Sequence, residues 1–254
     1  MEVALIQSSL FWEDPEANRK HFSKKIEALG KASDLIVLPE MFTTGFTMNP
    51  QNISGEEGSL TLEWMKQQAF RTDAALVGSV VFLEGKQYYN RLIFMKPDGQ
   101  FDTYDKRHTF TLAGEDKVYQ KGTHRNVIHF RGFTFCPLIC YDLRFPVWSR
   151  NTDNYDVLIY VANWPSPRVS AWDTLLRARA IENMAYVLGV NRVGTDPNDL
   201  DYSGHSAAYD SMGERITYSE EEAVLRLTLS KNHLEHTRDS FRFLEDRDSF
   251  TLRS

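Results

Sequence analysis

Apolar residues along the chain form short continuous runs, which predict strands, and recur three or four positions apart, which predicts helices. Together these two patterns predict a mixed α/β fold. The apolar run at residues 3–9 (VALIQSS) predicts a first strand. Asp14 and Pro15 then suit the N-cap and the first turn of a helix. That helix carries three apolar residues on one face: Phe22, Ile26 and Leu29. The N-terminal segment therefore predicts a strand followed by a helix.

The same order repeats further along the chain. Residues 34–40 (DLIVLPE) predict a buried strand, and residues 75–82 (ALVGSVVF) predict a third strand. Between them, Leu62, Met65 and Ala69 mark the apolar face of a second helix. Strands that alternate with helices predict a parallel sheet core with helices packed on its face.

Hairpins interrupt this order in the second part of the chain. The predicted elements are strands at 88–97 and 101–106 joined by the turn PDGQ, strands at 126–130 and 133–140 joined by an Arg-Gly turn, a strand at 155–163, a helix at 169–183, a strand at 186–194 and a hairpin around Gly213. Two mixed sheets with outer helices accommodate all of these elements.

We expect residues 1–254 to form a single domain, because no repeat, low-complexity tract or long linker divides them. Residues 231–254 are expected to form a C-terminal helix and tail. The tail (DSFRFLEDRDSFTLRS) is amphipathic and aromatic, so it suits docking on a partner subunit and packing on its own domain equally well.

Charge and motif content exclude several classes of function. The formal net charge is −6 with acids and bases interspersed, which argues against a nucleic-acid partner. No apolar stretch is long enough for a membrane span, and the start lacks the pattern of a signal peptide, so we expect a cytoplasmic protein without a membrane partner. The histidine spacing predicts no metal site, and no phosphate-binding glycine motif is present, so we expect no cofactor.

The two cysteines, Cys136 and Cys140, lie in the same predicted strand. Four residues of strand place them about 13 Å apart, which is too far for a disulfide, so each is expected to be a free thiol. Both fall on the same face of the strand, and periodicity alone does not say which one is reactive. Its position at the end of the strand favours Cys140.

Three polar side chains directly follow apolar runs: Glu40, Lys106 and Cys140. Ligands of open α/β folds bind beyond the carboxyl ends of the strands, so these residues could meet in one site. A carboxylate could accept the thiol proton, the thiolate could attack a carbonyl, and the ammonium could stabilise the oxyanion. The trio therefore suits acyl transfer.

Other interpretations of these residues remain open. A cysteine at a strand end is commonly a small buried hydrophobe, and Glu40 and Lys106 each suit a solvated loop. A Cys-His-acid hydrolase would instead use His108 or His205 as the base. A catalytically silent binding protein would retain the fold without the reaction.

Six segments together resemble the nitrilase (carbon–nitrogen hydrolase) superfamily, in order across nearly the whole chain: LPEMFTTGF, YDKRHTF, CYDLRFPVWSR, VANWP, ARAIENMAYVLGVNRVG and GHSAAYDSMGE. Within that superfamily the sequence is most similar to the omega-amidase branch. The resemblance implies an α/β fold that is a four-layer α-β-β-α sandwich, and a homodimer that forms through the helices flanking the cysteine turn. It also implies a Glu40, Lys106 and Cys140 triad. Glu115, seven residues before Gly122, is then expected to orient Lys106 and the substrate amide.

The branch implies hydrolysis of the terminal amide of 2-oxo acid amides such as 2-oxoglutaramate and 2-oxosuccinamate. Arg144, four residues after the cysteine, is expected to bind the substrate carboxylate or, alternatively, to form an internal ion pair with Asp142. Four further residues are expected to line the pocket: Tyr141, Phe42, Asn163 and Trp164. Aliphatic amides, N-carbamoyl compounds and deaminated glutathione remain alternative substrates, because the same triad serves all of them.

Overall fold

The computed structural model describes residues 1–251 and contains two six-stranded mixed sheets. The first sheet has the order β14-β1-β2-β3-β4-β5, in which β1, β2 and β3 are parallel and the other neighbours are antiparallel. Its strands are β14 (Ala223–Thr228), β1 (Glu2–Gln7), β2 (Leu35–Val37), β3 (Ala75–Glu84), β4 (Gln87–Met95) and β5 (Phe101–Asp105).

The second sheet has the order β13-β12-β9-β8-β7-β6, with β7, β8 and β9 parallel. Its strands are β13 (Arg215–Ser219), β12 (Ser206–Tyr209), β9 (Tyr186–Asn191), β8 (Val157–Ala162), β7 (Phe133–Ile139) and β6 (Ile128–Phe130). A separate two-stranded ribbon pairs β10 (Val193–Thr195) with β11 (Asp201–Ser203).

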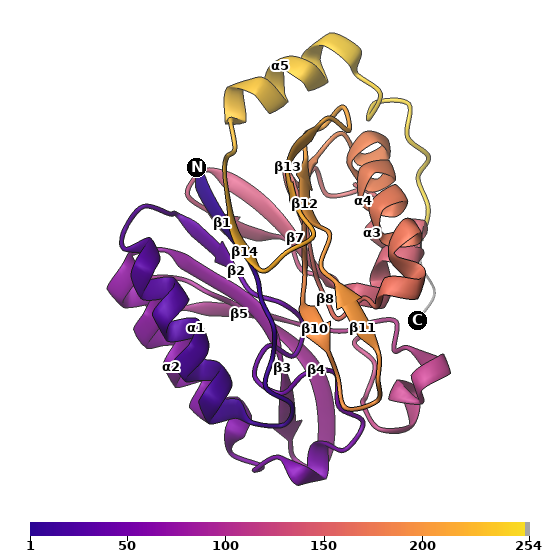
Figure 1. Cartoon of the computed structure of the whole chain (residues 1–254). Helices are drawn as coiled ribbons and strands as arrows, with labels where there is room; N and C mark the ends of the chain where they lie inside the picture. Colours follow the sequence, from indigo (N-terminus) through magenta and orange to yellow (C-terminus); the bar gives the residue numbers. More distant parts are fainter. Residues whose placement is uncertain (252–254) are drawn as a thin grey trace.

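Helices cover the two outer faces of the sheets. In Figure 1, α1 (Pro15–Leu29) and α2 (Glu57–Thr72) lie on one side, and α3 (Pro146–Ser149) and α4 (Val169–Asn183) lie on the other. The last helix, α5 (Lys231–Phe241), lies at one end of the sandwich. The predicted four-layer α-β-β-α architecture is confirmed.

Successive side chains of β1 point to opposite faces of the first sheet, and this alternation joins the layers. Val3 and Leu5 point into the core between the two sheets, whereas Ala4 and Ile6 pack against α1 and α2. The N-cap of α1 forms as predicted, because the Asp14 side chain accepts a hydrogen bond from the backbone N–H of residue 17 at 3.0 Å. The predicted apolar face of α1 is fully buried or nearly so: Phe22, Ile26 and Leu29.

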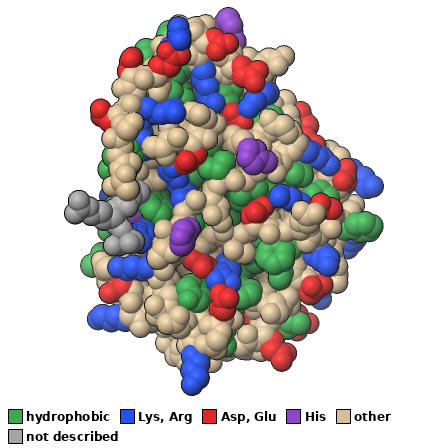
Figure 2. Space-filling view, turned by 180° about the vertical axis from the view of Figure 1, so that it is seen from behind, with side chains coloured by type: hydrophobic (Ala, Val, Ile, Leu, Met, Phe, Trp, Pro, Cys, Tyr) green, Lys and Arg blue, Asp and Glu red, His purple; other side chains and the backbone are tan. Residues whose placement is uncertain are grey.

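The C-terminal helix α5 packs on its own domain. Arg238 donates hydrogen bonds to the carbonyl oxygens of Met184 at 2.8 Å and Tyr155 at 2.7 Å, and it forms an ion pair with Asp156. Residues 252–254 of the predicted tail lie outside the described residues. Basic and acidic side chains are interspersed over the face shown in Figure 2. Within residues 1–251, no helix has the length and apolar character needed to cross a membrane.

Candidate active site

The ends of β2, β5 and β7 bring Glu40, Lys106 and Cys140 together, as the pattern of strand ends predicted. The Lys106 Nζ atom lies 2.8 Å from the Glu40 Oε1 atom, and the two side chains are 1% and 0% exposed. The Cys140 Sγ atom lies 4.0 Å from the backbone carbonyl oxygen of Asn163, whose backbone N–H donates to Glu40 Oε2 at 2.8 Å. A thiol, a carboxylate and an ammonium therefore share one buried cluster.

Glu115 belongs to the same cluster. It begins the short 3-10 helix η3 (Glu115–Lys117), and its carboxylate accepts hydrogen bonds from Lys106 Nζ at 2.9 and 3.1 Å. Asn90 on β4 donates to Glu40 at 2.8 Å and to Glu115 at 3.1 Å. The two carboxylates are thus held on either side of one ammonium, which keeps these buried charges paired.

Cys140 sits at a sharp turn between β7 and the 3-10 helix η4 (Cys140–Arg144). Its φ of 45° lies in the left-handed region, which costs a non-glycine residue about 1 kcal/mol. The fully buried Asp142 carboxylate holds the turn, because it accepts hydrogen bonds from the Ile139 N–H at 3.0 Å and the Tyr104 hydroxyl at 2.7 Å. The left-handed backbone conformation ends the strand at this position, and the Cys140 thiol borders a cavity.

Burial and charge shift the protonation of the cluster. Burial, with the Glu40 charge, raises the pKa of the Cys140 thiol well above its ordinary value. Burial also raises the pKa of Glu115 against the opposing effect of Lys106. Burial disfavours the charge of Lys106, but Glu115 and Glu40 outweigh that effect and raise the pKa of Lys106. The resting cluster therefore contains a neutral thiol beside a firmly charged ammonium.

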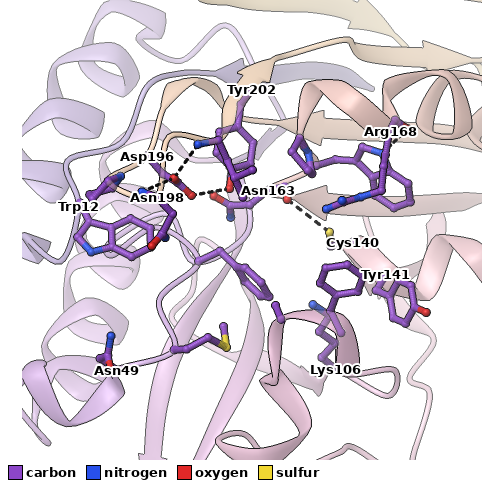
Figure 3. A pocket seen from close by; sticks show the side chains of 18 of the residues that line it. Trp12, Asn49, Lys106, Cys140, Tyr141, Asn163, Arg168, Asp196, Asn198 and Tyr202 are labelled. Carbon is purple, nitrogen blue, oxygen red and sulfur yellow. Dashed lines mark hydrogen bonds between the residues drawn. The ribbon is translucent and has the colours of Figure 1, made fainter.

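A cavity of about 390 Å³ opens over this cluster. In Figure 3, Lys106, Cys140, Tyr141 and Arg168 lie on one side of it, and Trp12 and Asn49 lie on the other. Residues from both sheets and from their connecting loops line the cavity: Trp12, Phe46, Met48, Asn49, Lys106, Phe110, Ala113, Cys140, Tyr141, Arg144, Asn163, Trp164, Pro165, Arg168, Asp196, Pro197, Asn198, Leu200 and Tyr202. A cavity of this size suits a small-molecule substrate.

Four of the five residues expected to line the pocket do so in the structure, and one does not. Tyr141, Arg144, Asn163 and Trp164 all line the cavity. Phe42 does not, and that expectation was wrong: its ring is fully buried in the core beneath the first sheet, 5.5 Å from the ring of Phe22. The Phe42 ring points inward and fills the core, and Phe46 lines the cavity instead.

Arg144 is exposed and makes no ion pair or side-chain hydrogen bond with any residue from 1 to 251. The alternative partner, Asp142, has its carboxylate occupied: the His108 backbone N–H and ring Nδ1 lie 3.0 and 2.7 Å from Oδ1. The guanidinium carbon of Arg144 instead lies 4.9 Å from the ring centroid of Trp164. Arg144 is therefore free to meet an anion in the cavity.

Neither candidate histidine lines the cavity in the described part of the chain. His108 stacks on Phe145 with ring centroids 3.7 Å apart, and its Nδ1 atom is engaged by Asp142. The His205 ring lies 2.9 Å from the Asp173 carboxylate. Both imidazoles have structural partners, which removes the geometric basis for a Cys-His pair.

Cys136 differs from Cys140 although the two lie on one chain segment. It is fully buried in the core and does not line the cavity, whereas Cys140 does. Burial raises the pKa of both thiols, that of Cys136 to about 12. Both cysteines are free thiols, as predicted. No group of three or more His, Cys, Asp or Glu side chains within residues 1–251 is arranged to hold a metal ion.

Sequence reasoning missed most of the cavity lining and the residue that connects the two glutamates, of which Arg168 and Asn90 bear most on the chemistry. Asn90 connects the two glutamates, and its only sequence signal is a polar residue inside the apolar strand YYNRLIFM. Arg168 lines the cavity from η5 (Ser166–Arg168), and it follows the VANWP motif by three residues. Nothing in the sequence alone distinguishes a loop arginine that lines a cavity from one that faces solvent.

Comparisons with known proteins agree with this site. A family model described as Carbon-nitrogen hydrolase matches residues 2–239. The omega-amidase YafV of Yersinia enterocolitica is 44% identical over 254 residues, which cover 99% of this chain and 98% of that protein. A 2-oxoglutaramate amidase of Bacillus subtilis is 32% identical over 250 residues, which cover 96% of each.

Solved structures share the fold. XC1258 from Xanthomonas campestris, a CN-hydrolase superfamily protein with an arsenic adduct in its active site, superposes with a TM-score of 0.96 at 41% identity and covers 100% of this chain and 99% of its own. Nit3 of Saccharomyces cerevisiae, of branch 10 of the nitrilase superfamily, gives a TM-score of 0.84 at 25% identity, with coverage of 95% and 94%.

The predicted resemblance to the nitrilase superfamily and its omega-amidases is confirmed by these similarities, and with it the prediction of an enzyme that cleaves carbon–nitrogen bonds. The matched family model spans nearly the whole chain, and the full-length relatives exceed 30% identity. The chain belongs to the carbon–nitrogen hydrolase family.

Proposed function

We propose that this hydrolase cleaves the terminal amide of a short 2-oxo dicarboxylic acid monoamide, 2-oxoglutaramate or 2-oxosuccinamate, through a thioester on Cys140. The observation that carries the proposal is the buried cluster of Glu40, Lys106 and Cys140 beneath a cavity that also holds an unpaired arginine. The names of its relatives, omega-amidase and 2-oxoglutaramate amidase, support this substrate class.

The first half of the reaction forms the thioester. As the Cys140 Sγ atom bonds to the amide carbon, its proton passes to the Glu40 carboxylate and the carbonyl oxygen becomes an oxyanion. Because the pKa of the thiol is raised, deprotonation accompanies the attack and does not precede it. The C–N bond then breaks, Glu40 returns the proton to the leaving nitrogen, and ammonia departs.

The second half hydrolyses the thioester. Glu40 accepts a proton from water as the water oxygen bonds to the acyl carbon, and the C–S bond then breaks. The proton returns to sulfur, which restores the thiol and releases the acid. The net change is amide plus water to acid plus ammonia, and no cofactor takes part in this proposal.

Lys106 is proposed to stabilise the oxyanion in both halves. Its ammonium makes three hydrogen bonds, two of which go to the same Glu115 carboxylate. One of those two can transfer to an oxyanion while the ammonium keeps an anionic partner on each side. The Tyr141 backbone N–H, directly after the nucleophile, is proposed as a second donor. Glu115 would orient Lys106 and the substrate amide.

Arg144 is proposed to bind the substrate carboxylate. Its guanidinium lies over the Trp164 ring, which restricts its orientation without using its N–H donors. A planar fork of donors matches a carboxylate in a bidentate arrangement. This contact would favour amides of acids over neutral amides.

The decisive experiment measures ammonia release from 2-oxoglutaramate by the wild type and by Cys140→Ala. Succinamate, N-carbamoyl-β-alanine and deaminated glutathione are assayed alongside. Strong turnover of the 2-oxo acid amide that is absent from the variant is the expected result. Turnover of a different substrate would keep the mechanism and refute the proposed substrate, whereas no turnover of any would favour a silent binding protein.

A homodimer is also proposed, formed through the face that carries α3 and α4. Large apolar side chains are exposed on these helices, with Val147 at 51% and Ile181 at 49%. Exposed aromatic residues of the tail, Phe241 and Phe243, would extend the contact. Light scattering of the wild type and of a Val147→Glu and Ile181→Glu double variant tests this, with a monomeric variant as the expected result. The cytoplasmic location and the single domain stay predictions.

A further inference from the structure

Two arginines line the cavity without a carboxylate partner. Arg144 and Arg168 make no ion pair or side-chain hydrogen bond with any residue from 1 to 251. Other arginines of the chain are used structurally: Arg91 and Arg131, for example, each bind two carboxylates. Free guanidinium groups in a concave site are ready-made partners for oxygen atoms of a ligand.

Both arginines are held by aromatic rings. The guanidinium carbon of Arg144 lies 4.9 Å from the ring centroid of Trp164, and that of Arg168 lies 5.2 Å from the ring centroid of Phe110. The Trp164 indole N–H also donates to the Arg168 backbone carbonyl at 2.7 Å. Trp164 is 3% exposed, so one fixed side chain lies against the Arg144 guanidinium and holds the backbone of Arg168. Each guanidinium therefore has an aromatic partner that restricts it before a substrate enters.

One carboxylate does not need two guanidinium groups, and the second one suits an additional oxygen. A 2-oxo acid carries its keto oxygen on the carbon next to the carboxylate. A second arginine that lines the same cavity can therefore donate to this oxygen. A 2-amino acid would place an ammonium group in the position of this oxygen. Both the ammonium and the guanidinium are hydrogen-bond donors with a positive charge, so they repel each other.

No free acid in the cavity would offset that repulsion. Asp196 is the one carboxylate among the described residues that line the cavity. Its oxygens already accept from the backbone N–H groups of Asn198 at 2.8 Å and Leu200 at 3.1 Å and from the Tyr202 hydroxyl at 3.0 Å. Figure 3 shows Asp196 beside Asn198 and Tyr202, on the far side of the cavity from Tyr141 and Arg168.

We infer that Arg168 recognises the 2-oxo group of the substrate and excludes the corresponding 2-amino acid, while Arg144 holds the carboxylate. This inference rests on the proposed function and adds a residue that determines specificity. It explains how the enzyme would act on 2-oxoglutaramate in the presence of glutamine, which has the same chain length, the same terminal amide and the same carboxylate. The two compounds differ only at the carbon that Arg168 faces in this assignment.

The test compares three amides that differ at carbon 2: 2-oxoglutaramate, glutaramate with a methylene, and L-glutamine with an ammonium. Arg168→Met is expected to lower kcat/KM for 2-oxoglutaramate by about 10- to 100-fold, the effect of one hydrogen bond from a charged donor. Its kcat/KM for glutaramate should change by less than about 3-fold, and its relative activity on glutamine should rise. Arg168→Lys, which keeps the charge, should lose less.

Arg144→Met is the matched control, because its ring-stacked guanidinium also lines the cavity. It should raise KM for all three acids and leave their ratios unchanged. Equal losses on 2-oxoglutaramate and glutaramate in Arg168→Met would overturn the assignment, as would an unchanged selectivity. If the wild type releases ammonia from none of the three, the proposed function fails and this inference fails with it.

Discussion

The floor and the wall of the cavity are built on different principles. The buried cluster beneath the cavity, which we call the floor, consists of Glu40, Lys106 and Glu115 beside the thiol. These three side chains are at most 1% exposed and bonded to one another at 2.8 to 3.1 Å. The wall carries Arg144 and Arg168, whose guanidinium groups rest on aromatic rings and bind no carboxylate of residues 1–251.

This difference assigns the catalytic steps to the floor and the choice of substrate to the wall. Buried charged groups that are hydrogen-bonded to one another cannot reorganise cheaply, so the floor presents one fixed electrostatic environment to the reacting carbon. Cations on the wall lie in higher dielectric and keep their donors free, so they can be exchanged for other residues without disturbing the core. Substitutions in the floor should therefore change kcat, and substitutions in the wall should change KM or selectivity.

Removal of the nucleophile is expected to have the largest effect. Cys140→Ala should lower kcat by at least about 10⁴-fold, because no thioester can form. The fold should persist, since the substitution removes only a sulfur atom that borders a cavity. Single-turnover assays with circular dichroism check both points. Residual activity near the wild-type value would mean that the floor is not the reaction site.

Glu115→Gln tests whether the floor depends on its second carboxylate. A loss of about 10²-fold in kcat is expected, because Lys106 would keep only one anionic partner and lose part of its orientation. The loss should appear at saturating substrate, with KM changed little. A change confined to KM would instead place Glu115 with the wall.

The raised pKa of Glu115 gives the same variant a pH signature. Wild-type activity should fall on the acid side at a higher pH than an ordinary glutamate would cause, and this limb should move to lower pH in Glu115→Gln. For folding, a raised carboxyl pKa favours the native state below the unfolded value of about 4.3 and loses that contribution as pH rises. The unfolding temperature of the variant relative to wild type should therefore rise between pH 4 and pH 7.

Sequence patterns predicted the floor better than the wall, and the reason is geometric. Lys106 and Cys140 directly follow strands β5 and β7, and Glu40 comes three residues after β2. The carboxyl ends of these strands converge at one edge of the sandwich. Phe42 and Arg168 lie in the connections, where one residue of difference decides between core and cavity. No periodicity governs such positions, so their side-chain directions follow only from the folded structure.

Arg144→Met tests the wall with a smaller effect. KM for 2-oxoglutaramate should rise about 10- to 100-fold, the cost of a lost charge-assisted contact, while kcat stays within about 3-fold. Butyramide, which has no carboxylate, should show the same KM with both proteins. A fall in kcat of the size seen for Glu115→Gln would mean that the wall and the floor are not separable.

The two thiols allow the smallest and sharpest test, because they differ in surroundings and not in chemistry. Cys136 is fully buried in the core four residues before Cys140, does not line the cavity, and has no carboxylate or ammonium of the floor beside it. Cys136→Ala should therefore leave kcat and KM unchanged and cost about 1 kcal/mol of folding stability, the effect of removing one buried heavy atom. Stoichiometric labelling with iodoacetamide should modify one cysteine in both the wild type and Cys136→Ala. If Cys136→Ala lost activity while staying folded, reactivity in this strand would not be confined to the residue at its end, and the assignment of the floor as a self-contained unit would be wrong.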